Sequence, residues 1–227
     1  MFKPALNITE QIADYVEEKI VTGELAEGAR VQEIKLAKAL EVSRGSIREA
    51  LLILERRRLI EVIPRKGAVV NALEARDASD VLELLASLEV RLFRLCLDQP
   101  EVLQAAQPIL RQIESAVREG DVAEVLKYRQ EYYRTLLSAG GRYLTAQFET
   151  LLPTSRRIMY RLIANTGLDL FDISRFYTAL HNALEDRSLE RVEELSGACN
   201  RRMLNLAQEH FGSWKCNTRR LQAVGEF

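Results

Sequence analysis

The stretch that decides the fold is ARVQEIKLAKALEVSRGSIREALLILERRRLIEVIPRKGAVV, residues 29–70. Its apolar spacing predicts a short helix over 32–40, then a tight turn and a longer helix over 43–57. Ser43 is a good N-cap for the longer helix, because its hydroxyl can accept a backbone N–H of the first turn. One face of that helix carries apolar residues at i, i+3, i+4 and i+7, which are Ile47, Ala50, Leu51 and Leu54.

On either side of these two helices the sequence pattern changes. Residues 59–63 and 68–70 are rich in β-branched side chains, and residues 64–67 between them are typical of a turn. Upstream, residues 7–22 carry apolar side chains at helical spacing. Three helices followed by a hairpin predict a winged helix-turn-helix, in which the hairpin is the wing.

The remainder of the chain has a helical pattern, so the predicted fold class is mainly α. We expect a winged helix-turn-helix domain over 1–72, a linker over 73–76, an all-α helical bundle over 77–212 and a weakly structured tail over 213–227. The helices expected in the bundle are 77–98, 101–119, 121–138, 141–165, 169–187 and 188–211.

The composition is that of an ordinary globular protein, with 47% hydrophobic and 29% charged residues. No apolar run approaches about 18 residues, and the first residues lack a signal-peptide core, so we expect a cytoplasmic protein without membrane contact. Cys96, Cys199 and Cys216 form no CxxC pair and are expected to be reduced thiols. The chain has no Gly-rich phosphate loop, HExxH or GxSxG motif, so we do not expect an enzyme.

The charge of the chain is unevenly distributed. The net charge is −1, but residues 44–66 hold seven Lys and Arg against three Glu, a local net of +4. Since the phosphate backbone dominates affinity for DNA, such a local concentration matters more than the total. The sequence therefore predicts a DNA-binding surface formed by the helix over 43–57 and the wing.

Arg44 and Arg48 lie one helical turn apart, on the face opposite the apolar stripe. Arginines in the first turns of a recognition helix can reach guanine edges in the major groove, and Gly45 between them leaves room for close approach. Ser43 and Ser46 can donate their hydroxyls to phosphate. The alternative interpretation of these residues is a charged helix face that is only solvated. Residues alone thus give seven candidates: Ser43, Arg44, Gly45, Ser46, Arg48 and, at the wing tip, Arg65 and Lys66.

The same stretch resembles the GntR family of bacterial regulators over residues 8–70. The family core L-A-x-x-L-x-V-S-R-x-x-(I/V)-R-E-A-L-x-x-L is nearly complete as LAKALEVSRGSIREALLIL, and the wing PRKGAVV also matches. The resemblance implies that Arg44, Ser46 and Arg48 contact DNA, with Ser43, Lys66 and Gly67 assisting. Two departures are Gly45, where relatives often carry Thr, and Arg57-Arg58, where relatives have a small or acidic residue and Gly.

The helical remainder resembles the FadR-type effector domain of that family, the FCD domain. Relatives hold a divalent metal with a D-x-x-x-H pair and two later histidines. Aligned with them, this chain has Arg129, Tyr133, Tyr177 and Cys199 at the ligand positions, and Leu85 replaces an arginine that clamps a carboxylate effector. Because a cation such as Arg129 repels a metal ion, we expect neither a metal nor another cofactor.

We expect the replaced ligand positions to line an effector pocket. Arg129 would clamp an anionic head group, such as that of an organic acid or an acyl derivative. Alternatively, Arg129 pairs with Glu89 and no ligand binds. The pattern also indicates a surface or capping role for His181, and a solvated helix face for Arg156, Arg157 and Arg161. The pocket candidates are Leu85, Glu89, Arg129, Tyr133, Tyr177 and Cys199.

These observations predict a ligand-responsive transcription regulator that binds double-stranded DNA. Because repression is the commoner outcome in the family, we expect a repressor. A homodimer would place two recognition helices on an inverted-repeat operator. The alternative is a constitutive DNA-binding dimer whose C-terminal domain only dimerises. An enzyme that uses a winged helix for protein contact finds no support in the motifs.

Overall fold

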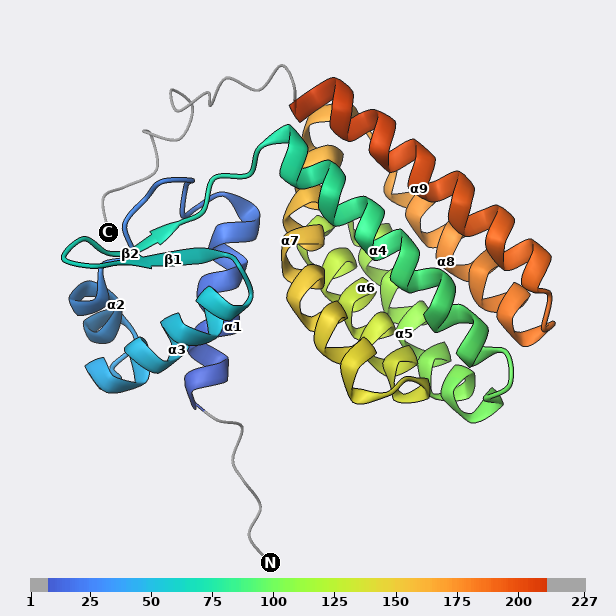
Figure 1. Ribbon diagram of the computed structural model, residues 1–227, viewed down its shortest axis with the longest axis horizontal. Coiled ribbons are helices and arrows are strands. Elements are labelled where there is room, and N and C mark those ends of the chain that lie inside the picture. Colours follow the sequence, from blue (N-terminus) through green and yellow to red (C-terminus); the bar gives the residue numbers. More distant parts are fainter. Residues whose placement is uncertain (1–7, 212–227) are drawn as a thin grey trace, which may run out of the picture. The chain divides into compact units, whose positions relative to one another are not determined.

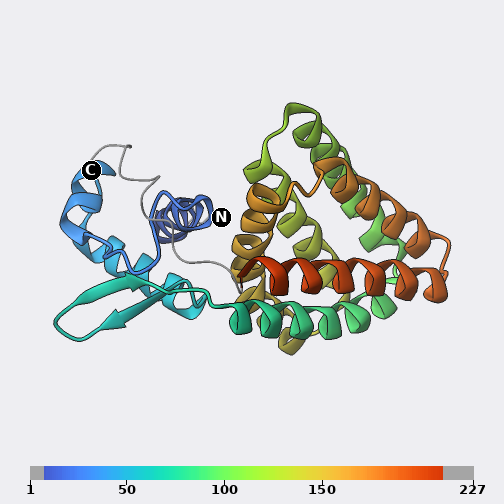
Figure 2. The same ribbon diagram turned by 90° about the horizontal axis from the view of Figure 1, so that it is seen from above.

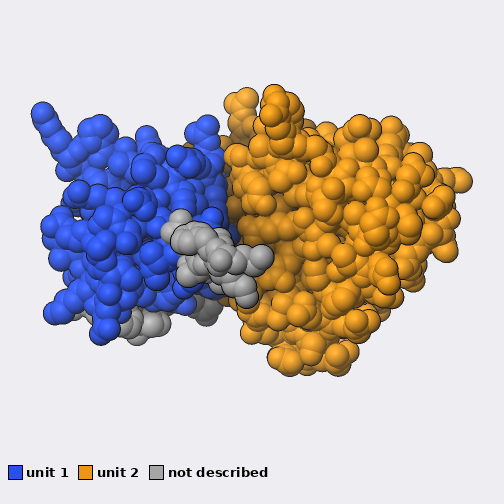
Figure 3. Space-filling model, turned by 90° about the horizontal axis from the view of Figure 1, so that it is seen from below, with its two compact units in different colours: residues 1–73, 214–227 blue, residues 74–213 orange. Residues whose placement is uncertain are grey.

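The structure is a computed structural model that describes residues 8–211. The described residues divide into two compact units, 8–73 and 74–211 (Figure 3). The tail that we expected over 213–227 lies outside the described residues, and so does Cys216.

The first unit holds three helices and a two-stranded antiparallel sheet (Figure 1). Its elements are α1 (Ile8–Thr22), α2 (Glu33–Ala39), α3 (Arg44–Arg56), β1 (Ile60–Ile63) and β2 (Gly67–Val70). The apolar stripe of α3 is buried against α1, and this packing forms the core of the unit together with the apolar sides of both strands. The predicted winged helix-turn-helix is confirmed, with element ends that differ by at most one residue from the expected ones.

The wing is completed by a segment that the sequence pattern did not reveal. Within the hairpin, Ile60 pairs with Val70 and the strands run antiparallel. The chain before α2 lies along the other side of β2, where Val31 N donates to Ala68 O at 2.9 Å and Val70 N donates to Ala29 O at 2.9 Å. An isolated bridge joins Arg30 and Val69 in this region. Residues 28–31 therefore fix the base of the wing.

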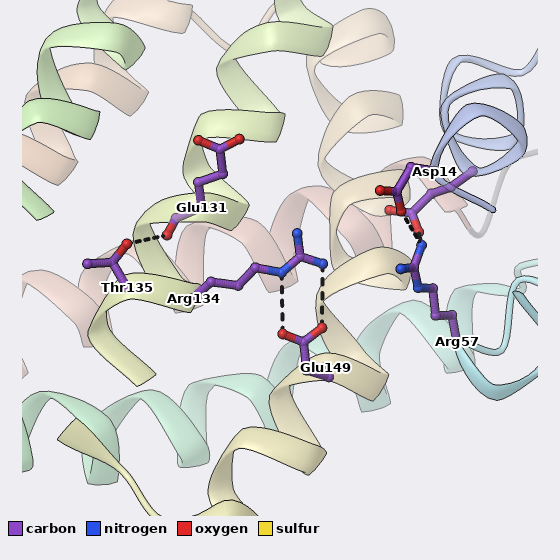
Figure 4. A network of polar contacts seen from close by, with 7 residues as sticks. Asp14, Arg57, Glu131, Arg134, Thr135 and Glu149 are labelled. Atoms are coloured by element: carbon purple, nitrogen blue, oxygen red, sulfur yellow. Dashed lines mark hydrogen bonds and ion pairs between the residues drawn. The ribbon is translucent and has the colours of Figure 1, made fainter. Parts of the chain in front are cut away.

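At the end of α3, Arg57 makes side-chain contacts with α1, and Arg58 lies in a tight turn. Arg57 turns back to α1, where its Nη1 lies 2.7 Å from Asp14 Oδ1 and 2.8 Å from Glu17 Oε2 (Figure 4). Arg58 has a φ of 59°, in the left-handed region that favours glycine. Its carbonyl accepts from Asn71 Nδ2 at 2.9 Å, which secures the turn into β1. Arg57 is thus part of the helix packing and not of the exposed basic surface.

The second unit is a bundle of helices (Figure 2). Helix α4 packs on α7 and α9, α6 on α5 and α7, and α8 on α5 and α9. The elements are α4 (Ala75–Cys96), α5 (Pro100–Glu119), α6 (Val122–Leu136), the 3-10 turn η1 (Leu137–Ala139), α7 (Arg142–Thr166), α8 (Leu170–Glu185) and α9 (Leu189–Phe211).

Helix α4 begins two residues earlier than expected, at Ala75. Asp77 explains the difference, because its carboxylate accepts the backbone N–H of Glu74 at 3.0 Å and closes the first turn. The helix therefore takes up half of the expected 73–76 linker. None of the helices described is long and apolar enough to cross a membrane.

Two expectations about polar residues of the bundle are wrong. Arg156 and Arg157 were expected on a solvated face, yet they are 5% and 3% exposed, because α7 is covered on several sides. Arg161, the third residue of that strip, is half-buried. His181 was expected at the surface, but it is 1% exposed, and its Nδ1 lies 3.1 Å from the hydroxyl of Tyr132.

Candidate functional sites

The start of α3 has the geometry that its sequence predicts. Ser43 is the N-cap, and its Oγ accepts the backbone N–H of Ser46 at 3.0 Å. The two hydroxyls are hydrogen-bonded to each other at 2.9 Å, and they lie at the helix N-terminus, where backbone N–H groups favour anions. Gly45 is exposed, and a Cβ at this position would meet only Ser43 Oγ, at 3.5 Å. Packing within the first unit therefore does not require glycine there.

Arg44 and Arg48 are both exposed beside this N-cap. Arg48 is held from the side by α2, because its Nε donates to Glu33 Oε2 at 3.0 Å. The two arginines border an open hollow whose lining includes four basic side chains and one carboxylate. Its lining residues are Arg30, Val31, Gln32, Glu33, Ile34, Lys35, Arg44, Arg48 and Gly67.

Sequence reasoning missed Arg30 and Lys35 as members of this basic surface. Arg30 is exposed and lies against the wing, so that a Cβ on Gly67 would come within 3.3 Å of its Nε. Gly67 also has a φ of 82°, so its backbone conformation favours glycine. Arg30 belongs to this surface because residues 28–31 pair with β2, and no local sequence pattern predicts that pairing.

The wing tip carries the remaining candidates. Arg65 and Lys66 are exposed in the turn between β1 and β2, and Lys66 N donates to Ile63 O at 3.0 Å. Arg65 has a φ of 65° and Gly67 follows in the same region of backbone space. The eight sequence-predicted residues thus lie at two places of the first unit, the start of α3 and the wing turn.

The second unit contains a cavity of about 390 Å³. It is bordered by residues of α4, α6, α7, α8 and α9 and by Leu168, which precedes α8. All six predicted pocket residues line this cavity, namely Leu85, Glu89, Arg129, Tyr133, Tyr177 and Cys199. The apolar part of its wall consists of Leu82, Leu85, Met159, Leu168, Ile173, Phe176, Ala179, Leu195, Ala198 and Met203.

Two buried charges and two tyrosines form a hydrogen-bonded chain in the cavity wall. Arg129 Nε donates to Tyr177 Oη at 2.7 Å, Tyr177 Oη donates to Tyr133 Oη at 3.4 Å, and Tyr133 Oη donates to Glu89 Oε1. Asn200 donates from its Nδ2 to the other oxygen of Glu89, Oε2, at 3.3 Å. Arg129 and Glu89 are only 6% and 5% exposed.

The sequence left open a direct pair between Arg129 and Glu89, and the described residues show none. The Nη1 of Arg129 is buried and has no hydrogen-bond partner. Burial acts to lower the pKa of Arg129, but Tyr177, Tyr133 and Glu89 outweigh it, so the pKa is raised and the guanidinium stays charged. The pKa of Glu89 is also raised, since burial outweighs the opposing hydrogen bond from Tyr133 and the charge of Arg129.

The chemistry of this set does not suit a divalent metal ion. Burial raises the pKa of Tyr177 to about 12 and that of Cys199 to about 12, so both groups are protonated near neutral pH. A charged guanidinium and neutral phenol and thiol groups are poor partners for a cation. Among residues 8–211, no group of three or more His, Cys, Asp or Glu could hold a metal ion.

Comparisons with known families agree with both units. The model of the bacterial regulatory proteins of the gntR family matches residues 8–70, and the model of the FCD domain matches residues 80–202. The chain belongs to the GntR family. Its second unit carries the FCD domain, as the sequence resemblance implied.

Individual relatives show the same affiliation. The chain is 33% identical over 138 residues to the Nta operon transcriptional regulator of Aminobacter aminovorans, covering 60% of this chain and 62% of that protein. It is 28% identical over 130 residues to the HTH-type regulator YdhC of Bacillus subtilis, covering 56% of this chain and 58% of that protein. The matched part thus spans about three fifths of the length of these relatives.

Solved structures share the fold at low sequence identity. Escherichia coli McbR/YncC matches with a TM-score of 0.75 at 19% identity, covering 93% of this chain and 100% of that one. A GntR-type regulator from Rhodococcus sp. RHA1 matches with a TM-score of 0.66 at 19% identity, covering 87% of this chain and 98% of that one. These similarities establish the architecture of the GntR-family protein described here.

Proposed function

We propose that this GntR-family protein is a ligand-responsive transcription regulator that binds a specific double-stranded DNA operator. The observation that carries the proposal is the exposed pair Arg44 and Arg48 at the capped N-terminus of α3. Arg30, Lys35 and the wing turn extend the same basic surface. In this proposal, residues 1–72 bind DNA and residues 77–212 dimerise and bind the effector.

The basic surface supports DNA binding by two separate contributions. Arg44 and Arg48 are positioned for base edges, because they leave the first turns of α3 on its exposed face. Ser43, Ser46 and the wing residues suit phosphate oxygens, which fix the position of the protein without reading sequence. A homodimer then binds an inverted repeat and represses the adjacent genes, and the bacterial cytoplasm is where such a protein acts.

Fluorescence anisotropy with the purified full chain tests the DNA-binding half of the proposal. The binding site is first selected from random duplexes, and its affinity is then measured at several salt concentrations. We expect a negative slope of log affinity against log salt, since phosphate contacts release counterions. We also expect that Arg44→Ala loses discrimination between the selected site and a scrambled duplex, whereas equal discrimination in both proteins would contradict the proposal.

The cavity of the second unit supports the effector half. Its 390 Å³ lies within the usual range of small-molecule sites, about 300–1,000 Å³, and its wall is mostly apolar with a few convergent polar groups. Light scattering of the purified protein would establish whether it is a dimer. If the dimer binds DNA and no small molecule changes its melting temperature or DNA affinity, the constitutive alternative replaces the ligand-responsive function.

A further inference from the structure

The cavity holds a buried guanidinium, that of Arg129, and a buried carboxyl group, that of Glu89, which do not contact each other directly. Arg129 and Glu89 both line it, both are more than nine-tenths buried, and no ion pair joins them among the described residues. A buried charge is costly unless it is paired and hydrogen-bonded. Because the two groups are not in direct contact, each can still bind a group of a ligand.

The hydrogen-bonded chain explains how the two charges are kept apart. Every donor in it points the same way, from Arg129 Nε through the hydroxyls of Tyr177 and Tyr133 to Glu89. The two tyrosines therefore connect the charges and also hold them at opposite ends of a polar row. Tyr133 is fixed further by stacking, with the Arg129 guanidinium carbon 5.1 Å from the centre of its ring.

Each end of the row keeps unused hydrogen-bonding capacity. Arg129 Nη1 has no partner, although Arg129 is only 6% exposed. Each oxygen of Glu89 accepts one hydrogen bond, from Tyr133 or from Asn200, although a carboxylate oxygen has two lone pairs. One end of the row can thus receive an acceptor and the other end can receive a donor.

We propose that the effector of this cavity is a zwitterion, an α-amino acid with an apolar side chain. Its carboxylate would bind Arg129 Nη1, its ammonium group would bind Glu89, and its side chain would lie along the apolar wall. This inference rests on the effector role assigned above to the same cavity. The wall that would receive the side chain includes Leu82, Leu85, Met159, Leu168, Ile173 and Met203.

The size of the cavity agrees with this class of ligand. A volume of 390 Å³ lies at the small end of the range of small-molecule sites, about 300–1,000 Å³. A ligand of about nine to twelve non-hydrogen atoms, such as leucine, methionine or phenylalanine, fits within that volume.

Ligands that carry only one of the two charges satisfy the cavity less well. A simple carboxylic acid would bind Arg129 and leave Glu89 without a donor from the ligand. A simple amine would leave Arg129 Nη1 unpartnered and add a second cation. Only a ligand with both groups binds both buried side chains at once.

Isothermal titration calorimetry and thermal unfolding of the full chain test the proposal. The probes are L-phenylalanine, L-leucine and L-methionine, together with 3-phenylpropanoate, which lacks the ammonium group, and phenethylamine, which lacks the carboxylate. We expect saturable binding of at least one amino acid and a rise in melting temperature. The matched truncated probes should bind at least about 100-fold more weakly, because each leaves a buried polar group of the site unpaired.

Two variants assign the ends of the ligand, and one serves as a control. Glu89→Gln should reduce the preference for the amino acid over 3-phenylpropanoate, whereas Arg129→Gln should reduce its preference over phenethylamine. Arg134→Gln is the matched control on the same helix, since Arg134 is 41% exposed and pairs with Glu149 on α7 (Figure 4). It should bind the probes as the wild type does.

The outcomes separate this proposal from the function on which it rests. If 3-phenylpropanoate binds as tightly as L-phenylalanine, or if none of the amino acids binds, the zwitterion proposal is overturned. Wild-type protein alone decides this, so a variant that fails to fold does not rescue it. Salt-dependent binding to the selected operator would still stand in either case, whereas loss of that binding would refute the regulator function itself.

Discussion

The substitution Arg48→Ala is expected to separate DNA recognition from folding. The Arg48 side chain is 63% exposed, and its one ion pair joins Nε to Glu33 at 3.0 Å. Exposed pairs of this kind contribute about 0–1 kcal/mol, so the free energy of unfolding should fall by no more than about 1 kcal/mol. An arginine that pairs bidentately with guanine contributes about 1–3 kcal/mol of discrimination, which is about 5- to 140-fold per half-site.

The assay compares the wild type, Arg48→Ala and Arg56→Ala by anisotropy on the selected operator and on versions with single base changes. Arg56 is a matched control, because it is an exposed arginine at the opposite end of the same helix. We expect Arg48→Ala to lose affinity and to become indifferent to one base pair in each half-site. The Arg56 variant should keep the base preference of the wild type. Unchanged base preference in Arg48→Ala, or a loss of stability of several kcal/mol, would refute the assignment.

Three further predictions concern stability, each measured by urea denaturation. Leu54→Ala should lower the free energy of unfolding by about 3–5 kcal/mol, because Leu54 is 0% exposed in the core. Leu52→Ala is the control and should lower it far less, since Leu52 is 49% exposed. Equal losses in the two variants would contradict the packing of α3. Burial lowers the pKa of His181 below 6.5, so the folded state disfavours its protonation, and the wild type should lose stability as the pH falls below 6.5. His181→Gln should make the free energy of unfolding depend less on pH in this range. Parallel plots of that free energy against pH for the two proteins would contradict the prediction. Burial raises the pKa of Glu89 above 4.5, so the folded state disfavours its ionisation. The wild type should therefore lose stability relative to Glu89→Gln as the pH rises from about 4.5 toward 7. A difference in unfolding free energy that stays constant over this range would contradict the prediction.

The first unit was largely predictable because its signals are local. The stripe of α3, the Ser43 cap and the β-branched strands each depend on residues a few positions apart. The contacts that escaped prediction join distant segments. Residues 28–31 reach β2 about forty positions later, and Arg57 reaches Asp14 across 43 positions. Neither contact has a periodic signature in the sequence.

In the second unit, resemblance to the family located the cavity residues, but not their contacts. The spacing of Arg129 and Tyr133 places both on one face of α6, and that much follows from helical geometry. The row of hydroxyls that keeps Arg129 from Glu89 depends on Tyr177, which lies 48 positions away on α8. The burial of Arg156, Arg157 and His181 was missed because charged or polar residues usually face solvent, and periodicity does not show how many helices surround one.

The most direct test of the central claim is to recover and sequence the genomic DNA that the purified protein binds, with Arg44→Ala as the comparison. The structure predicts a small number of sites that share an inverted repeat and that disappear with the variant. Recovery spread across the genome without a shared motif, in wild type and variant alike, would contradict the claim that this GntR-family protein is a sequence-specific regulator.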